Sequence, residues 1–437
     1  MTTITTSEGI NPSHRGFRGA VAQDIVTKSA LSRLPEHAPP AVAVSAKEAI
    51  RPFRIDIPEE ALVDLRNRLA ATRLPDEETV SDFSQGVPLK TIKQLLRHWR
   101  TKYDWRKVEA KLNSYPNFIT EIDGLDIHFI HVRSKHENAL PLIVTHGWPG
   151  SVIEQLKIID LLTNPTAHGG SASDAFDIVI PSMPGYGFSG KPTATGWGPE
   201  RIARAWTTLM RRLGYKHFVA QGGDWGAVVT DMIGVQAPPE LLGIHTNMPG
   251  AVPVDVNQAS FGAAPAPAGL SVEEKATYDQ LVFFYQHVYY AFWMGTRPQT
   301  AAAFSDSPIG LATFLIDHDA RSLELIARSF DGQAEGLTPD DVLDNVTLFW
   351  LTNTGVSSAR LYWENKLPFF TPKGVKVPAA VSVFPDELYQ TSRNWAERAY
   401  PNLIHYNKVA KGGHFAAWEQ PKLLTEELRT GFRSLRK

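Results

Sequence analysis

Apolar positions near the start of the chain recur with a helical period. Residues 53–76 and 89–104 carry apolar side chains three and four positions apart, which predicts two amphipathic helices. Asp56 and Glu59 have the spacing of a capping box at the start of the first helix, and Pro75 is expected to end it. These residues predict a small helical segment ahead of any sheet.

From residue 118 onward the period shortens. Residues 118–134 alternate apolar and polar side chains around Asp123-Gly124, which is typical of a β-hairpin. Compact apolar runs at 140–147 and 176–183 end in Gly/Pro loops and suit buried parallel strands. Further strand patterns lie in 217–234, 241–250, 376–387 and 402–415. Strands that alternate with helices predict an α/β fold with a mostly parallel, twisted sheet flanked by helices.

A block of aromatic-rich helical patterns interrupts this alternation. Because the block lies between two stretches of one sheet, it predicts a cap over the carboxyl ends of the strands, where α/β sheets bind ligands. The expected organisation is a polar, poorly ordered tail, an N-terminal helical segment, a first core part, a helical cap and a second core part, at residues 1–50, 51–118, 119–250, 251–370 and 371–437.

Composition narrows the class of protein. The chain has 437 residues, a formal net charge of −2, 43% hydrophobic residues and no cysteine. This near-neutral balance gives no reason to expect a nucleic acid or an anionic membrane surface as partner, and thiolate chemistry is excluded. No window reaches the roughly 18 apolar residues of a membrane span, and the polar N-terminus lacks the apolar run of an export signal. We therefore expect a soluble, cytoplasmic protein, with a homodimer among the open options.

The sequence Gly222-Gly223-Asp224-Trp225-Gly226 falls where a strand pattern runs into a helix pattern. It has the form of a nucleophile elbow in which aspartate replaces serine. An aspartate that attacks saturated carbon leaves an ester, which water can cleave, whereas a serine would leave a stable ether. The motif therefore predicts a nucleophile that opens an epoxide or an alkyl halide, and it argues against an esterase.

Three further groups complete the expected chemistry. His414 lies in a Gly-Gly-His loop after the last strand pattern, in the chain position of an α/β-hydrolase base. Asp386 and Glu387 follow the preceding strand, and either could orient that imidazole. The backbone amides of Trp148, in the loop after 140–147, and of Trp225 are the candidate oxyanion hole.

Two other patterns point away from cofactors. Residues 185–190 match G-x-G-x-x-G, but neither the helix nor the acidic residue that a dinucleotide site needs follows. The Asn345 glycosylation match falls in a predicted helix, and no His-rich spacing indicates a metal. No cofactor and no metal are therefore expected.

From about Phe53 to the C-terminus the chain resembles the microsomal-type epoxide hydrolases of the α/β-hydrolase fold. The resemblance rests on 53–76 and on the ordered motifs HGWPGS, GGDWG, DSPIGLA, FPDE and GGHFAAWEQP. It implies Asp224 as nucleophile, His414 as base and Glu387 as the acid. Some relatives carry an N-terminal membrane anchor, where this chain has a polar tail.

The resemblance also implies two cap tyrosines that protonate the epoxide oxygen. The first precedes a Thr-Arg-Pro segment, and its spacing selects Tyr290, with Tyr289 as competitor. The second is Tyr362 in SSARLYWEN. The expected activity is hydrolysis of an apolar, small-molecule epoxide to a vicinal diol through an aspartyl ester. A haloalkane dehalogenase and a non-catalytic binding module are the alternatives.

Overall fold

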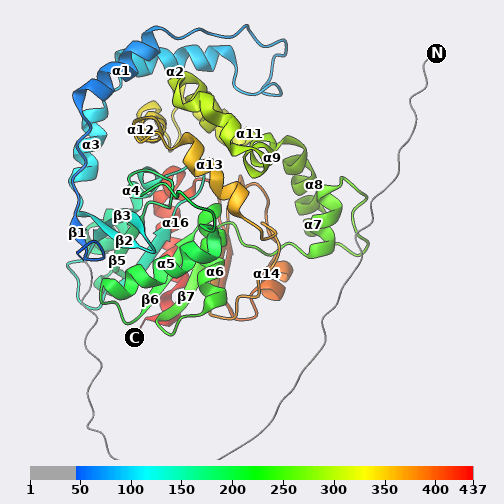
Figure 1. Cartoon of the computed structure of the whole chain (residues 1–437). Helices are drawn as coiled ribbons and strands as arrows, with labels where there is room; N and C mark the ends of the chain where they lie inside the picture. The colour runs from blue at the N-terminus through cyan, green and yellow to red at the C-terminus, as the bar shows by residue number, and fades with distance from the viewer. Residues whose placement is uncertain (1–45, 437) are drawn as a thin grey trace, which may run out of the picture. The chain divides into compact units, whose positions relative to one another are not determined.

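One sheet forms the centre of the molecule. The computed structural model describes residues 46–436 (Figure 1). In this part of the chain nine strands pair in the order β1-β2-β3-β5-β4-β6-β7-β8-β9. Their bounds are Arg51–Pro52 (β1), Asn117–Ile122 (β2), Leu125–Val132 (β3), Leu140–Thr145 (β4), Phe176–Pro181 (β5), Phe218–Gly222 (β6), Leu241–Thr246 (β7), Ala379–Val383 (β8) and Leu403–Lys408 (β9). Neighbours from β5 to β9 run parallel, while β1, β2 and β3 pair antiparallel, so the predicted α/β class is confirmed.

The predicted hairpin joins β2 to β3. Asp123 and Gly124 have φ of 53° and 79°, which is the backbone of a two-residue hairpin turn. Along β4, successive side chains point to opposite faces of the sheet. Ile143 packs in one hydrophobic cluster, whereas Leu142 and Val144 pack in the other. A strand buried on both faces therefore appears in the sequence as a continuous apolar run.

Helices cover both faces of this sheet. Contacts link α5 (Pro199–Arg212) to α6 (Trp225–Gln236), and α4 (Leu156–Thr163) to α16 (Pro421–Gly431). Side chains of α5 and α6 belong to one hydrophobic cluster and those of α4 and α16 to the other. The remaining core helices are α14 (Arg393–Ala399) and α15 (Ala416–Glu419), and the short 3-10 helices are Val152–Gln155, Pro165–His168, Ala172–Asp174, Pro298–Ser305 and Arg433–Leu435. Residues 185–190 form turns rather than the start of a helix, as expected.

The N-terminal helices differ in detail from the prediction. Helix α1 (Glu59–Ala70) begins after Pro58 without a side-chain cap, so the predicted capping box is wrong. It ends at Ala70, before Pro75, and the backbone at Ala71 is no longer helical. Helix α2 (Leu89–Thr101) lies where expected, and a further helix, α3 (Trp105–Asn113), follows it. Asp104 caps the start of α3. The sequence prediction missed this helix because it begins shortly after the end of α2.

Seven helices fill the inserted block and pack over one end of the sheet (Figure 1). They are α7 (Val254–Phe261), α8 (Val272–His287), α9 (Tyr289–Thr296), α10 (Pro308–Ile316), α11 (Ala320–Phe330), α12 (Pro339–Leu351) and α13 (Gly355–Glu364). Trp148, just after β4, contacts Tyr290, Phe314 and Tyr362 of this block, so the cap covers the carboxyl ends of the strands.

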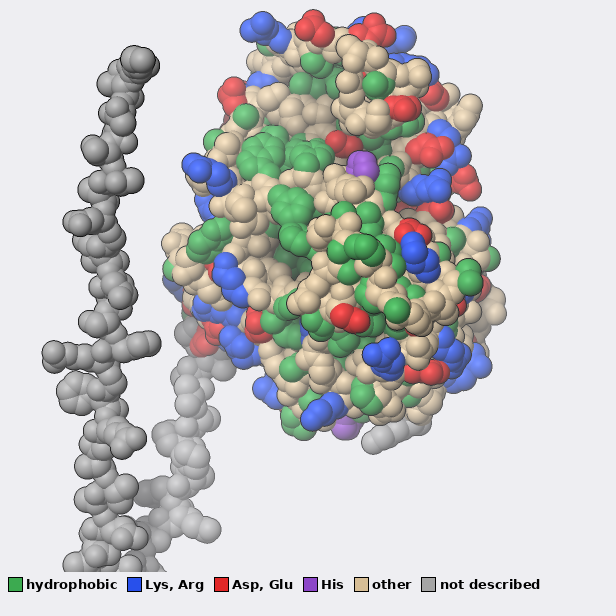
Figure 2. Space-filling model, turned by 90° about the vertical axis from the view of Figure 1, so that its right-hand side faces the viewer, with side chains coloured by type: hydrophobic (Ala, Val, Ile, Leu, Met, Phe, Trp, Pro, Cys, Tyr) green, Lys and Arg blue, Asp and Glu red, His purple; other side chains and the backbone are tan. Residues whose placement is uncertain are grey.

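The outer surface of the cap carries several large apolar side chains. Phe261, Phe283, Tyr289 and Phe292 are exposed, and Figure 2 shows hydrophobic side chains grouped on the upper part of the face in view. Within residues 46–436, no helix is long and apolar enough to cross a membrane.

Candidate active site

Asp224 occupies the sharp turn between β6 and α6. Its φ of 49° and ψ of −128° are strained for a residue with a side chain. The flanking glycines make this turn possible: a Cβ on Gly222 would lie 2.0 Å from the Gly226 carbonyl, and a Cβ on Gly226 would lie 2.0 Å from the Thr145 carbonyl. The turn places the carboxylate at the edge of the sheet, beneath the cap.

The two oxygens of the buried Asp224 carboxylate have different partners. Trp148 N donates to Oδ1 at 2.7 Å, and His414 Nε2 lies 3.5 Å from Oδ2, which makes an ion-pair contact rather than an aligned hydrogen bond. Burial raises the pKa of Asp224, but His414, the charge of His318 and the Trp148 amide outweigh it and lower the pKa below its usual value. The carboxylate is therefore ionised at neutral pH, with Oδ2 as its less constrained oxygen.

His414 is held from the other side by Glu387. His414 Nδ1 lies 2.6 Å from Oε1 of Glu387, and both side chains are buried. Burial lowers the pKa of His414, but the negative charges of Glu387 and Asp224 raise it well above its usual value. Asp386, the other candidate acid, is exposed and contacts the His414 loop through its backbone. The geometry therefore distinguishes two neighbours that the sequence left open.

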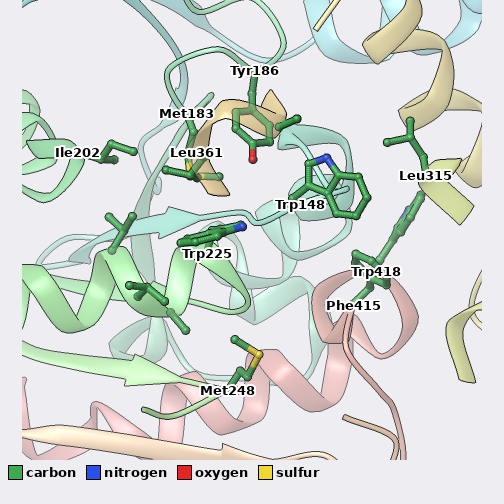
Figure 3. Packing of buried hydrophobic residues seen from close by; sticks show 14 of the residues in the cluster. Trp148, Met183, Tyr186, Ile202, Trp225, Met248, Leu315, Leu361, Phe415 and Trp418 are labelled. Atoms are coloured by element: carbon green, nitrogen blue, oxygen red, sulfur yellow. The ribbon is translucent and has the colours of Figure 1, made fainter. Parts of the chain in front are cut away.

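The rings of both expected cap tyrosines pack against the two tryptophans beside this carboxylate. The ring of Tyr290, at the start of α9, stacks on Trp148 with centroids 5.0 Å apart. The ring of Tyr362, on α13, meets Trp225 edge-on at 4.8 Å and lies 6.2 Å from Tyr290. Figure 3 shows the two indoles approaching from different elements, the β4 loop and the first turn of α6. Burial and then the charge of Asp224 raise the pKa of each phenol well above 10, so each hydroxyl keeps its proton.

Tyr289, the competitor, points elsewhere. It is 47% exposed, and its hydroxyl donates to Asp317 Oδ2 at 3.0 Å. Two backbone amides were expected to form the oxyanion hole. Within the described residues the Trp148 amide donates to Asp224, whereas the Trp225 amide does not.

Sequence reasoning missed a second histidine at this site. His318, between α10 and α11, stacks on His414 with centroids 4.3 Å apart and an interplanar angle of 28°. Its Nδ1 lies 2.9 Å from Oδ2 of the half-buried Asp319. Burial raises the pKa of Asp319, but the hydrogen bond and charge of His318 dominate and lower it to about 2. In the sequence His318 lies in Asp-His-Asp directly after an apolar helix. This pattern does not reveal that the ring stacks on a histidine of the core.

Among residues 46–436, one group of three side chains could supply metal ligands: Asp224, His318 and His414. The imidazole planes of the two histidines stack at 28°, so their lone pairs lie in two nearly parallel planes. A tetrahedral metal requires ligand lone pairs that converge on one point. The arrangement therefore fits a stacked pair better than a metal centre.

A second buried acid, Glu154, was also missed. It lies in the 3-10 helix that follows HGWPGS, and its Oε1 accepts from Gln155 Nε2 at 2.6 Å. Burial and then the charge of Asp224 raise its pKa, while Gln155 and His414 lower it, with a result of about 8. In the sequence this residue reads as an ordinary polar position in a helix start.

The fold and the site together define an α/β-hydrolase with an aspartate in the nucleophile position. Two family models match, "Epoxide hydrolase N terminus" over residues 50–155 and "alpha/beta hydrolase fold" over residues 141–261. The chain is 50% identical, over 89% of its length and 86% of the relative's, to a Stigmatella aurantiaca protein whose epoxide hydrolase name is provisional. It is 35% identical to epoxide hydrolase 1 of Oryctolagus cuniculus, over 87% of this chain and 88% of that protein.

Solved structures agree with these matches. The juvenile hormone epoxide hydrolase of Bombyx mori superposes with a TM-score of 0.79 at 28% identity, over 91% of this chain and 98% of that one. The Aspergillus niger epoxide hydrolase gives 0.74 at 29% identity, over 89% and 97%. The chain belongs to the epoxide hydrolase family and is an epoxide hydrolase. This membership favours the epoxide over the alkyl halide and over a non-catalytic role.

Proposed function

We propose that this epoxide hydrolase converts an apolar epoxide to a vicinal diol through a covalent ester on Asp224. The arrangement of the Asp224 carboxylate carries the proposal. Its Oδ1 is fixed by the Trp148 amide, whereas its Oδ2 lies 3.5 Å from His414 Nε2. One oxygen is thus held as a future carbonyl oxygen, while the other is available to attack.

The first step opens the epoxide ring. Oδ2 of Asp224 bonds to an epoxide carbon, the bond from that carbon to the ring oxygen breaks, and the departing oxygen takes a proton from Tyr290 or Tyr362. A phenol with a pKa well above 10 is protonated at neutral pH and can act as this general acid. The buried tryptophans around the phenols exclude bulk water from the developing alkoxide.

The second step hydrolyses the ester. Once Asp224 is esterified, its negative charge no longer raises the pKa of His414, so the imidazole can take a proton from water. The hydroxide oxygen then bonds to the ester carbon, and the negative charge develops on Oδ1. The Trp148 amide already donates to that atom, and we expect the Trp225 amide to join it in the tetrahedral state. The bond to the alkyl oxygen then breaks, and this oxygen takes the hydroxyl proton of the tetrahedral state, so that the diol leaves and Asp224 is ionised again. The proton on His414 returns through solvent to the tyrosinate formed in the first step. Glu387 holds the imidazole and stabilises its charged form.

Trapping the ester tests this proposal. Asp224→Ala should abolish turnover, and His414→Gln should accumulate an adduct on Asp224 whose mass equals that of the epoxide. In one turnover in heavy-oxygen water, the label should enter the Asp224 carboxylate rather than the diol. Undiminished multiple turnover by Asp224→Ala, or a label that enters only the diol, refutes the ester route. The homodimer and the cytoplasmic location stay predictions.

A further inference from the structure

A small polar cavity lies beside Asp224. It has a volume of about 20 Å³, and its lining includes Asp224, His414, Glu154, Gln221 and Asn247. About 10–15 Å³ of such space suffices for one water molecule, provided that two to four polar groups surround it. The cavity thus has the size and the polarity to hold a single water beside the nucleophile.

The polar atoms around this cavity include unused hydrogen-bonding capacity. Gln221 Oε1, Gln155 Oε1 and His414 Nε2 are buried and have no hydrogen-bond partner within residues 46–436. Gln155 also lines the cavity. Buried acceptors without partners are costly, and a bound water relieves that cost. The side of His414 that would take a proton therefore faces the same space as these acceptors.

Glu154 is aimed into this region by the glycine loop ahead of it. A Cβ on Gly150 would lie 1.8 Å from Glu154 Oε2, so the carboxyl group fills the space that a side chain at 150 would take. Its other oxygen is fixed by Gln155 Nε2. Glu154 is 7% exposed, and its carboxyl group makes no ion pair with a Lys or Arg side chain in the described chain. Nothing in the ring-opening step uses this acid.

We propose that Glu154 binds the hydrolytic water and orients it for attack on the Asp224 ester, while His414 removes the proton. This inference rests on the proposed ester route and assigns the water site within it. The water donates one hydrogen bond to His414 Nε2 and the other to a side-chain oxygen of Glu154 or Gln221. An oxygen lone pair of the water is then directed at the ester carbon. Because burial raises the pKa of Glu154 to about 8, its carboxyl group is mostly protonated at neutral pH and does not compete with His414 as the base.

Glu154 should therefore act on the second step alone. Glu154→Gln keeps the size and the packing of the side chain but changes the donor and acceptor that meet the water. We expect ester hydrolysis to slow by about tenfold or more, the effect of losing one strong hydrogen bond in the transition state. Ester formation should keep its rate, so kcat and KM should fall by the same factor while kcat/KM stays constant. Gly150→Ala, which displaces the Glu154 carboxyl group, should act in the same direction.

The experiment is a single-turnover acid quench with styrene oxide, read by the mass of the intact protein. Asp344→Asn is the matched control, because Asp344 is also an acid whose pKa burial raises, to about 7, but its partners are Tyr103 and the charges of Asp340, Asp341 and Lys157. The control should form and hydrolyse the ester at wild-type rates.

The outcomes distinguish a failure of the proposed water site from a failure of the ester route. Accumulation of ester in Glu154→Gln at an unchanged rate of ester formation supports the water site. Wild-type hydrolysis in Glu154→Gln, or an equal fall in ester formation, overturns it while the ester route stands. Absence of ester even in His414→Gln defeats the ester route itself.

Discussion

The cap tyrosines allow the sharpest test of the ring-opening step. Replacing Tyr290 or Tyr362 with phenylalanine removes a hydroxyl and keeps a ring. The rings pack at centroid distances of 5.0 Å on Trp148 and 4.8 Å on Trp225, and phenylalanine can keep both contacts. We therefore expect the free energy of unfolding of either variant to change by less than about 1 kcal/mol.

The expected kinetic effect follows from the charge that each phenol meets. A general acid typically contributes roughly 10²–10⁴-fold, and the second phenol remains in each single variant. We expect ester formation to slow about 10²-fold in each single variant, or about 2.7 kcal/mol, and about 10⁴-fold in the double variant. Because ester formation comes first, kcat/KM should fall with it, unlike the result expected for Glu154→Gln.

The assay is the rate of ester formation in a single turnover, followed by rapid quench. Tyr289→Phe is the control, since Tyr289 is adjacent in sequence but bonds to Asp317 at the surface. The phenol pKa values lie well above 10, so loss of the general acid should not reduce kcat/KM between pH 8 and 10. Wild-type ester formation in the double variant would refute the assignment of both tyrosines.

Three other predictions concern the base and the elbow. His318→Ala should slow ester hydrolysis by roughly two- to tenfold, because it removes the ring stacked on His414, and His318→Phe should restore most of the rate; equal rates in all three proteins would contradict this. Glu387→Gln should lower the pKa of His414 and slow hydrolysis by roughly 10²-fold or more, whereas Asp386→Asn should leave the single-turnover rate unchanged. Gly226→Ala should destabilise the fold by more than about 2 kcal/mol in urea unfolding, since its Cβ would lie 2.0 Å from a strand carbonyl; an unchanged midpoint would show that the elbow can relax.

Local patterns predicted the parts of the fold that depend on neighbours in sequence. The hairpin at Asp123-Gly124, the buried strands and the Asp224 elbow all follow from side chains within a few residues of one another. The capping box at Asp56 failed because Pro58 starts the helix without a side-chain bond. Helix α3 was missed because only Lys102, Tyr103 and Asp104 separate its start from the end of α2.

Contacts between distant segments account for what the sequence did not predict. The sequence marked both Asp386 and Glu387, but it cannot say which one points to His414, since that depends on the path of the loop after β8. His318 and Glu154 come from the cap and from the segment after β4, and each reaches the site through packing. Their residue types are ordinary for a helix end, so only the folded arrangement distinguishes them.

The division of the site between core and cap explains why Glu154 matters. The core supplies Asp224, His414 and the Trp148 amide, which are sufficient to hold an ester, while the cap tyrosines are needed only to open the ring. Hydrolysis then requires one water near the ester carbon, and the cavity beside Glu154 lies among core residues. The two steps therefore use different groups around one carboxylate. Substitutions of the cap tyrosines should change how fast the epoxide opens, whereas substitutions around Glu154 should change how long the ester lasts.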